Sequence, residues 1–146
     1  MLMNIESIQK TIDGTDYWDA LILDLEINYF GDEVLLYIEN DEKTCYKVSF
    51  LSCYKVNYET DANWRGEFKV KEMRNGRLGY YGQDISLEKY KETNESIKQA
   101  IEKYGGTDDF IRCSLDLSIM TMTIVCKEII VEERKLEDTS FYWNDK

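Results

Sequence analysis

Pairs of carboxylates are the residues in this sequence whose spacing could most readily do chemistry. Asp24 and Glu26 alternate along one predicted strand, whereas Glu39, Asp41 and Glu42 gather at a predicted turn. Two carboxylates that face one glycosidic bond can hydrolyse it. The chain has 29 acidic residues in 146, so neighbouring acids also arise by chance, and a solvated strand face is the simpler explanation of Asp24 and Glu26. A histidine-free carboxylate hydrolase is therefore the third of three functional hypotheses.

The residues of most other catalytic and metal sites are missing. The chain has no histidine, which removes imidazole-based triads, histidine metal sites and the most common general acid–base residue. The polar turn at 40–42 lacks the glycine and the downstream glutamate of a calcium-binding loop, and the glycines form no phosphate-binding motif. We therefore expect no cofactor, no metal and no enzymatic activity.

The cysteines are dispersed and form no CxxC pair: Cys45, Cys53, Cys113 and Cys126. This is not the spacing of a disulfide framework or a zinc site. A reactive thiolate would need a basic neighbour or a helix terminus, and buried, reduced thiols are the simpler expectation. Without a secretory segment or a run of about 20 apolar residues, the sequence indicates a cytoplasmic protein with no membrane partner. An even number of cysteines also permits an exported protein with two disulfides.

The formal net charge of the chain is −11, from 18 basic and 29 acidic side chains. Nucleic acids and anionic membranes are bound through lysine and arginine, so neither is an expected partner. An acidic protein attracts basic partners, although negative charge can also serve solubility alone. The predicted partner-binding residues are the acids Asp24, Glu26 and Glu39 together with Trp64, because tryptophan is frequent among interface hot spots. Trp64 lies in an irregular segment, and core packing is its alternative role.

The first part of the chain predicts a short helix followed by a meander of strands. Isoleucines spaced by three and four at 5–12 indicate the helix. The odd-numbered apolar residues of 21–27 alternate with polar ones, so we expect them in the core and the acids between them to be solvated or at an interface. A second strand is expected at 34–39. Residues 44–58 indicate one long strand, or two short strands bent near Ser52.

The second part of the chain predicts a hairpin, a helix and more sheet. Asn75-Gly76 is a strong hairpin signal between possible strands at 67–73 and 78–85, because both central residues of the tight turn need a positive φ. A hydrophobic stripe predicts a helix over about 86–104. In the first half of 110–131 the apolar residues occupy odd-numbered positions, and in the second half they occupy even-numbered positions. This change indicates one strand with a bulge or bend, or else a hairpin.

Two short stretches resemble a known group of proteins. Tyr17-Trp18-Asp19-Ala20 leads from a short helix into an alternating strand, and a later strand reads Cys126-Lys127-Glu128-Ile129-Ile130-Val131-Glu132. These stretches are similar to small, mostly uncharacterised bacterial proteins, some of which resemble immunity proteins of polymorphic toxin systems. That group often has histidine where this chain has Trp18. The resemblance implies a non-enzymatic protein that binds and blocks a toxin, such as a basic nuclease, and it assigns no functional residue.

Together these patterns predict one globular domain over residues 1–135 and a charged tail at 136–146, which either frays or packs back through its aromatic residues. The predicted fold class is α+β and mainly β. It is a curled antiparallel sheet or partly open barrel of about 6–8 strands, with a main helix at about 86–104 and a short N-terminal helix. The first functional hypothesis is a protein-binding module, an immunity protein that blocks a basic toxin. The second is a small-ligand binder that uses the interior of the curved sheet. The sequence sets no oligomeric state.

Overall fold

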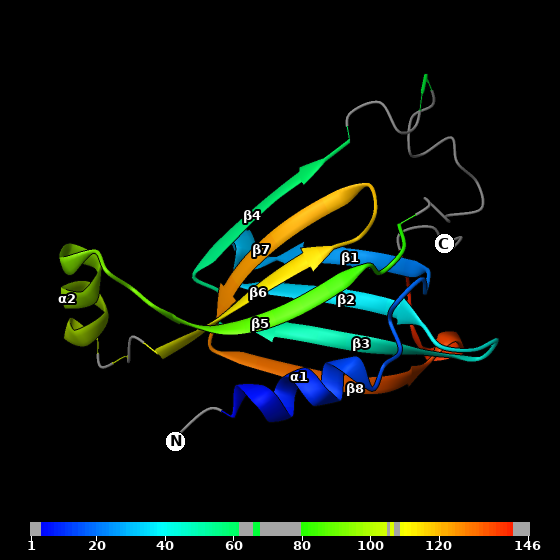
Figure 1. The fold of residues 1–146 in the computed structure, drawn as a ribbon, viewed down its shortest axis with the longest axis horizontal. Helices are drawn as coiled ribbons and strands as arrows, with labels where there is room; N and C mark the ends of the chain where they lie inside the picture. Colours follow the sequence, from blue (N-terminus) through cyan, green and yellow to red (C-terminus); the bar gives the residue numbers. More distant parts are fainter. Residues whose placement is uncertain (1–3, 62–65, 68–79, 105, 107–108, 142–146) are drawn as a thin grey trace.

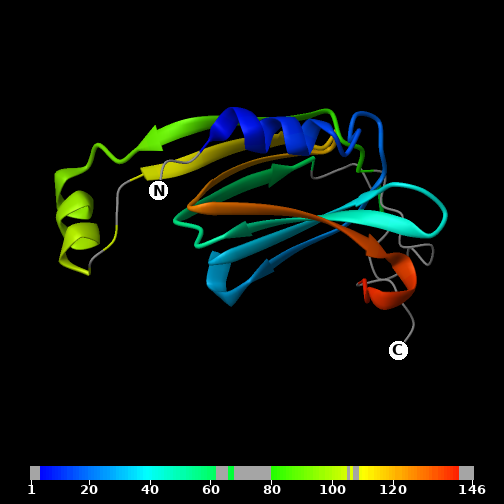
Figure 2. The ribbon, with the colours of Figure 1, turned by 90° about the horizontal axis from the view of Figure 1, so that it is seen from below.

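The computed structural model describes residues 4–61, 66–67, 80–104, 106 and 109–141. These residues form two four-stranded antiparallel sheets that face each other (Figures 1 and 2). The strand order is β1-β2-β3-β8 in the first sheet and β4-β7-β6-β5 in the second. In chain order the strands are β1 Ile22–Asn28, β2 Glu33–Glu39, β3 Thr44–Leu51, β4 Lys55–Thr60, β5 Asp84–Lys91, β6 Asp109–Asp116, β7 Met120–Cys126 and β8 Glu128–Lys135. The mainly β fold class is confirmed, and the described strands form two facing sheets rather than a closed barrel.

The two sheets pack through one hydrophobic core. Alternate residues of each strand point into it, including Leu36 of the first sheet and Ile124 of the second, both inaccessible to solvent. Helix α1 (Ile5–Asp13) starts after Asn4, which caps it, and Ile12 of this helix is buried in the same core. Because α1 packs beside β5 and β8, it covers the side of the sandwich where these two terminal strands lie (Figure 2).

A bulge in β1 changes which of its residues are buried. The register with β2 shifts between Ile22 and Asp24, so Leu23 is an extra residue in the ladder. After the bulge Leu25 and Ile27 face the second sheet, whereas Leu23 packs on the outer face of its own sheet. The prediction that the odd-numbered residues share one buried face is therefore wrong. Leu23 is buried in a separate cluster, Leu25 is half-buried and Ile27 is exposed.

A second, smaller hydrophobic cluster covers part of the outer face of the first sheet: Leu21, Leu23, Tyr37, Cys45 and Phe141. Phe141 follows the short 3₁₀ helix η3 (Leu136–Asp138), and its ring packs edge-on against Tyr37 with centroids 5.2 Å apart. At Phe141 the predicted tail therefore packs back onto the sheet.

The chain passes from one sheet to the other between β3 and β4 and again between β7 and β8. Ser52, with a φ of 53°, lies between β3 and β4, so residues 44–58 form two strands that belong to different sheets. The segment 110–131 contains the hairpin β6–β7, which turns at Ser118 with a φ of 73°. At Lys127 the chain leaves this hairpin and continues as β8 in the first sheet.

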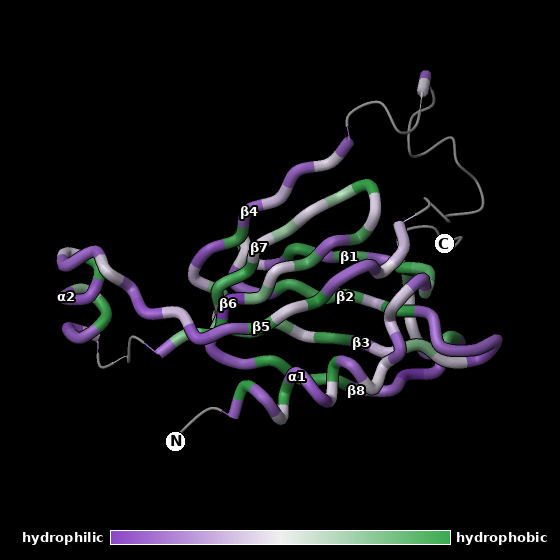
Figure 3. The backbone as a smooth tube through the Cα atoms, in the orientation of Figure 1, coloured by the Kyte–Doolittle hydropathy of each residue, from purple (hydrophilic) through white to green (hydrophobic). Residues whose placement is uncertain are grey.

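The predicted helix at 86–104 is wrong in its first half, which belongs to β5. Ile85 is buried and Leu87 half-buried at alternate positions, and β5 pairs with β6 along its length, so sheet pairing outweighs the helical stripe. Helix α2 (Glu95–Lys103) starts only after Asn94 and extends away from both sheets (Figures 1 and 2). Hydrophobic and hydrophilic residues alternate along it, as they do along α1 (Figure 3).

The predicted turn at Asn75-Gly76 lies outside the described residues, as does the predicted strand at 67–73 except for Glu67. Of the predicted strand at 78–85, the described part includes Tyr81 and Gly82, which form isolated bridges with Leu21 and Trp18. Within the described part of the chain, no helix is long and apolar enough to cross a membrane.

Candidate partner-binding surface

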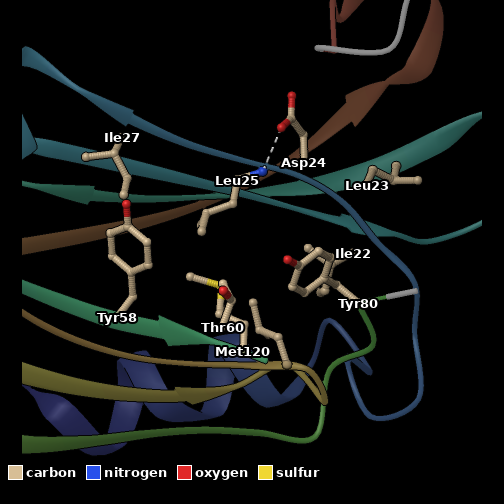
Figure 4. A pocket seen from close by; sticks show the side chains of 10 residues that line it. Ile22, Leu23, Asp24, Leu25, Ile27, Tyr58, Thr60, Tyr80 and Met120 are labelled. Atoms are coloured by element: carbon tan, nitrogen blue, oxygen red, sulfur yellow. Dashed lines mark hydrogen bonds between the residues drawn. The ribbon is translucent and has the colours of Figure 1, made fainter. Parts of the chain in front are cut away.

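An apolar cleft lies at the edge of the sandwich opposite α1. The two walls of the cleft are formed mainly by β1 and β4, the terminal strands of the two sheets (Figure 4). The cleft has a volume of about 350 Å³, and its lining residues are Ile22, Leu23, Asp24, Leu25, Ile27, Tyr58, Thr60, Tyr80, Leu117 and Met120. The helix that covers the β5 and β8 side has no counterpart among the described residues on this side.

Two side chains at the mouth of the cleft face each other from opposite sheets. Ile27 projects from β1 and Tyr58 from β4 (Figure 4). Both occupy inward-facing positions, yet Ile27 is 38% and Tyr58 is 55% exposed. Burial of apolar surface contributes roughly 25 cal/mol per Å². Burial of these two side chains by a partner would therefore contribute free energy to binding, because the fold itself leaves them exposed.

The turn between β1 and β2 presents two aromatic side chains on an unfavourable backbone. Tyr29 and Phe30, in the 3₁₀ turn η1 (Tyr29–Gly31), have φ angles of 53° and 60°. A left-handed backbone costs an ordinary residue roughly 1–2 kcal/mol, and Gly31, with a φ of 101°, is the residue of this turn that adopts it freely. Tyr29 is 72% exposed and Phe30 is fully exposed. Neither side chain offsets the cost by burial within the fold.

A shallow hollow of about 270 Å³ connects this turn to β4, lined by Tyr29, Phe30, Gly31, Asp32, Cys53, Tyr54 and Val56. The turn therefore lies beside the strand that carries Tyr58. Ile27, Tyr29, Phe30 and Tyr58 together form a row of exposed apolar side chains along one side of the molecule. We call these four residues the aromatic edge.

The negative charge of the chain is concentrated in the segment that contains β1 and β2. Between Lys10 and Lys43 there is no basic residue, and there are ten acidic ones: Asp13, Asp16, Asp19, Asp24, Glu26, Asp32, Glu33, Glu39, Asp41 and Glu42. All 18 basic residues lie outside this segment, so the rest of the chain is nearly neutral. We call residues 11–42 the acidic segment. It includes three of the four residues of the aromatic edge.

A buried carboxylate lies at the end of β5, before α2. Glu92 accepts hydrogen bonds from the Tyr54 hydroxyl at 2.6 Å and the Asn94 amide at 2.9 Å, and Lys55 Nζ lies 3.4 Å from it. These donors lower the pKa of Glu92 to about 2, while burial and the adjacent carboxylate raise the pKa of Tyr54 to about 12. Glu92 is thus ionised at neutral pH and cannot donate a proton, and this network has one carboxylate where a glycosidase needs two. Through the Asn94 amide, Glu92 is hydrogen-bonded to the N-cap residue of α2.

The sequence profile of the family Immunity protein PIM7 matches residues 4–133. The chain belongs to this family. No curated protein matches the chain significantly. The predicted resemblance to immunity proteins is confirmed, and the family implies a binding role toward a toxin. The match includes both β-sheets up to the last residues of β8, and with them the cleft, the aromatic edge and the acidic segment.

In this PIM7 family member the three acids predicted to bind a partner share the outer face of the first sheet. Asp24 is only 7% exposed, its carboxylate points away from the cleft (Figure 4), and its Oδ1 accepts a hydrogen bond from the Leu25 amide at 2.8 Å. Of the two environments predicted for Asp24, solvated or at an interface, the solvated one is wrong, because the bulge pairs Asp24 with Tyr37 on the outer face of the sheet. Glu26 and Glu39 are half-buried. Burial, with Glu26 and Asp24 nearby, raises the pKa of Tyr37. Partner binding by the three acids stays a prediction.

The aromatic edge was not predicted from the sequence, from which Trp64 was predicted instead. Trp64 lies outside the described residues, so its role in partner binding also stays a prediction. A signal for the aromatic edge was present in the sequence, because Tyr29 and Phe30 directly precede Gly31 and Asp32 at the end of an alternating strand. Aromatic residues immediately before a turn glycine are poorly explained by turn formation, which favours small or polar residues.

All four cysteines of the PIM7 family member are free thiols, and Cys45, Cys113 and Cys126 are buried. Burial raises the pKa of each of them, to about 12 for Cys126, and burial with Asp32 nearby raises the pKa of half-buried Cys53 to about 11. The thiols are therefore protonated at neutral pH and unsuited to nucleophilic attack. Over the described ranges, no group of three or more cysteine, aspartate and glutamate residues could hold a metal ion.

Proposed function

We propose that this protein is a non-enzymatic inhibitor that binds a basic toxin and blocks the surface through which the toxin acts. The observation that carries the proposal is the PIM7 family match, which extends over residues 4–133. The acidic segment supports a basic partner, because opposite surface potentials speed the encounter of two proteins and exclude wrong partners.

The chemistry of the buried polar groups supports binding rather than catalysis. Glu92 is held ionised by its donors, and the four thiols are held protonated by burial. Free thiols also support action in a reducing compartment such as the cytoplasm, where disulfides are rare. A toxin would then be neutralised by a stoichiometric complex and would remain chemically unchanged.

The direct test is co-expression with the product of the gene that neighbours the gene for this protein, taken as the candidate toxin. We expect cells that produce both proteins to grow, cells that produce the toxin alone to stop, and the two purified proteins to form a complex of fixed stoichiometry. Absence of both protection and complex would contradict toxin binding. Full protection by a small fraction of an equivalent, with a covalent change in the toxin mass, would contradict the non-enzymatic mechanism.

The cleft supports a second candidate, a protein that binds a small apolar ligand. Its volume of about 350 Å³ lies within the range of small-molecule sites, and its lining is mainly apolar. Native mass spectrometry of the purified protein distinguishes this candidate, which predicts a bound compound in stoichiometric amount. A mass equal to that of the bare chain would contradict it.

A further inference from the structure

We propose that the toxin is bound at the aromatic edge, with Phe30 and Tyr58 as its main contacts and basic toxin residues facing the surrounding acids. This inference rests on the proposed function, since it takes the partner to be a toxin. It assigns the interface to the open side of the sandwich, which differs from the outer sheet face where the predicted acids Asp24, Glu26 and Glu39 lie.

The fold leaves the aromatic edge without an internal role. Phe30 is fully exposed on a left-handed backbone, and Tyr58 is more than half exposed at the mouth of the cleft. Tyrosine and other aromatic residues dominate the energetics of protein interfaces when a partner desolvates them. The cleft of about 350 Å³ is lined by Ile27 and Tyr58, and the hollow of about 270 Å³ is lined by the turn, and each could accept a side chain of the toxin.

Charge complementarity identifies the kind of partner that fits this surface. Asp32 is exposed directly after the turn, and Glu59 and Asp61 are exposed beside Tyr58. Lys55, the basic residue of β4, is engaged with the Tyr90 hydroxyl at 2.8 Å and with Glu92. Carboxylates thus lie next to the apolar row, between the turn and β2 and at the end of β4. An apolar centre with a polar rim is the arrangement that protein interfaces show. A toxin surface with an apolar patch among lysines and arginines matches it.

Helix α2 carries another exposed apolar surface, and it fits a basic toxin less well. Ile97, Ile101 and Tyr104 line a shallow depression beside Lys127. The helix has two glutamates and two lysines, so it presents no net charge. With Lys127 at the border, this surface lacks the complementarity that the aromatic edge provides, and we therefore assign toxin binding to the aromatic edge.

The test compares exposed aromatic residues inside and outside the aromatic edge. The binding variants are Phe30→Asn and Tyr58→Ser, and the matched controls are Trp18→Ser and Tyr104→Asn, which also alter exposed rings. Dissociation constants for the candidate toxin, the product of the neighbouring gene, are measured in 0.15 M salt, with thermal melts to verify folding. We expect each binding variant to weaken affinity about 30-fold or more, the level of an interface hot spot, and each control less than about threefold.

The outcomes separate this inference from the proposed function. If the unmodified protein fails to bind the toxin, the proposed function fails and the inference fails with it. If the unmodified protein binds and the folded binding variants bind equally well, the inference alone is overturned. Loss of affinity in Tyr104→Asn without loss in the binding variants would place the interface on α2 and would also overturn it.

Discussion

Replacement of Phe30 by asparagine should stabilise the isolated protein. Phe30 is fully exposed, so its side chain loses no buried contact on substitution. Its backbone is left-handed, with φ 60° and ψ 22°, which costs most residues roughly 1–2 kcal/mol, whereas asparagine adopts it more readily. If asparagine recovers about half of that cost, the free energy of unfolding should rise by about 0.5–1 kcal/mol.

Urea unfolding followed by circular dichroism measures this change, with the slope of the transition unchanged. Phe30→Ala is the first control. It keeps a Cβ on the left-handed backbone, so its free energy of unfolding should stay within about 0.5 kcal/mol of the unmodified protein. Trp18→Asn is the second control, because Trp18 is exposed but its backbone is not left-handed, and we expect no gain there. A loss above about 0.5 kcal/mol in Phe30→Asn, or an equal gain in Phe30→Ala, would refute the reasoning.

The core, the buried carboxylate and the thiols each give a further measurable outcome. Leu36→Ala removes a fully buried side chain between the sheets and should cost about 2–5 kcal/mol in urea unfolding; a cost under about 0.5 kcal/mol would contradict the described core. Glu92 has its pKa lowered from 4.5 to about 2 on folding, so its contribution is complete above pH 4.5 and disappears as the pH falls toward 2. The difference in melting temperature between the unmodified protein and Glu92→Gln should therefore shrink over that pH range, and a difference independent of pH would oppose this account. Melts with and without reductant should agree, since the four cysteines are free thiols; a fall of many degrees on reduction would show that disulfides form.

Much of the sheet could be predicted because alternating residues report local strand geometry. The bend at Ser52 and the change of parity within 110–131 were both visible in the sequence, and both correspond to breaks between strands. The faces of β1 could not be predicted, since the bulge at Leu23 depends on its pairing with β2 and leaves no local signal. Pairing with a neighbouring strand likewise determines the secondary structure of residues 84–91, which are extended because they pair with β6.

The excess of negative charge could be read from the sequence, whereas the position of the aromatic edge could not. Net charge is readable from composition, and the concentration of acids in residues 11–42 is readable from their order. The position depends on which edge of the sandwich stays open, and this follows from the packing of α1 against β5 and β8. Ile27 and Tyr58 are 31 positions apart in the sequence and meet only because β1 and β4 end their respective sheets (Figure 4).

The association rate constant as a function of salt tests the central claim most directly. For the candidate toxin, the account predicts a rate that falls steeply as salt screens long-range attraction, with a screening length of about 10 Å at 0.1 M and about 3 Å at 1 M, while dissociation changes little. Asp32→Lys, next to the aromatic edge, should slow association several-fold, whereas Asp138→Lys, in the C-terminal 3₁₀ helix, should slow it much less. An association rate that is insensitive to salt, or equal effects of the two charge reversals, would contradict the account.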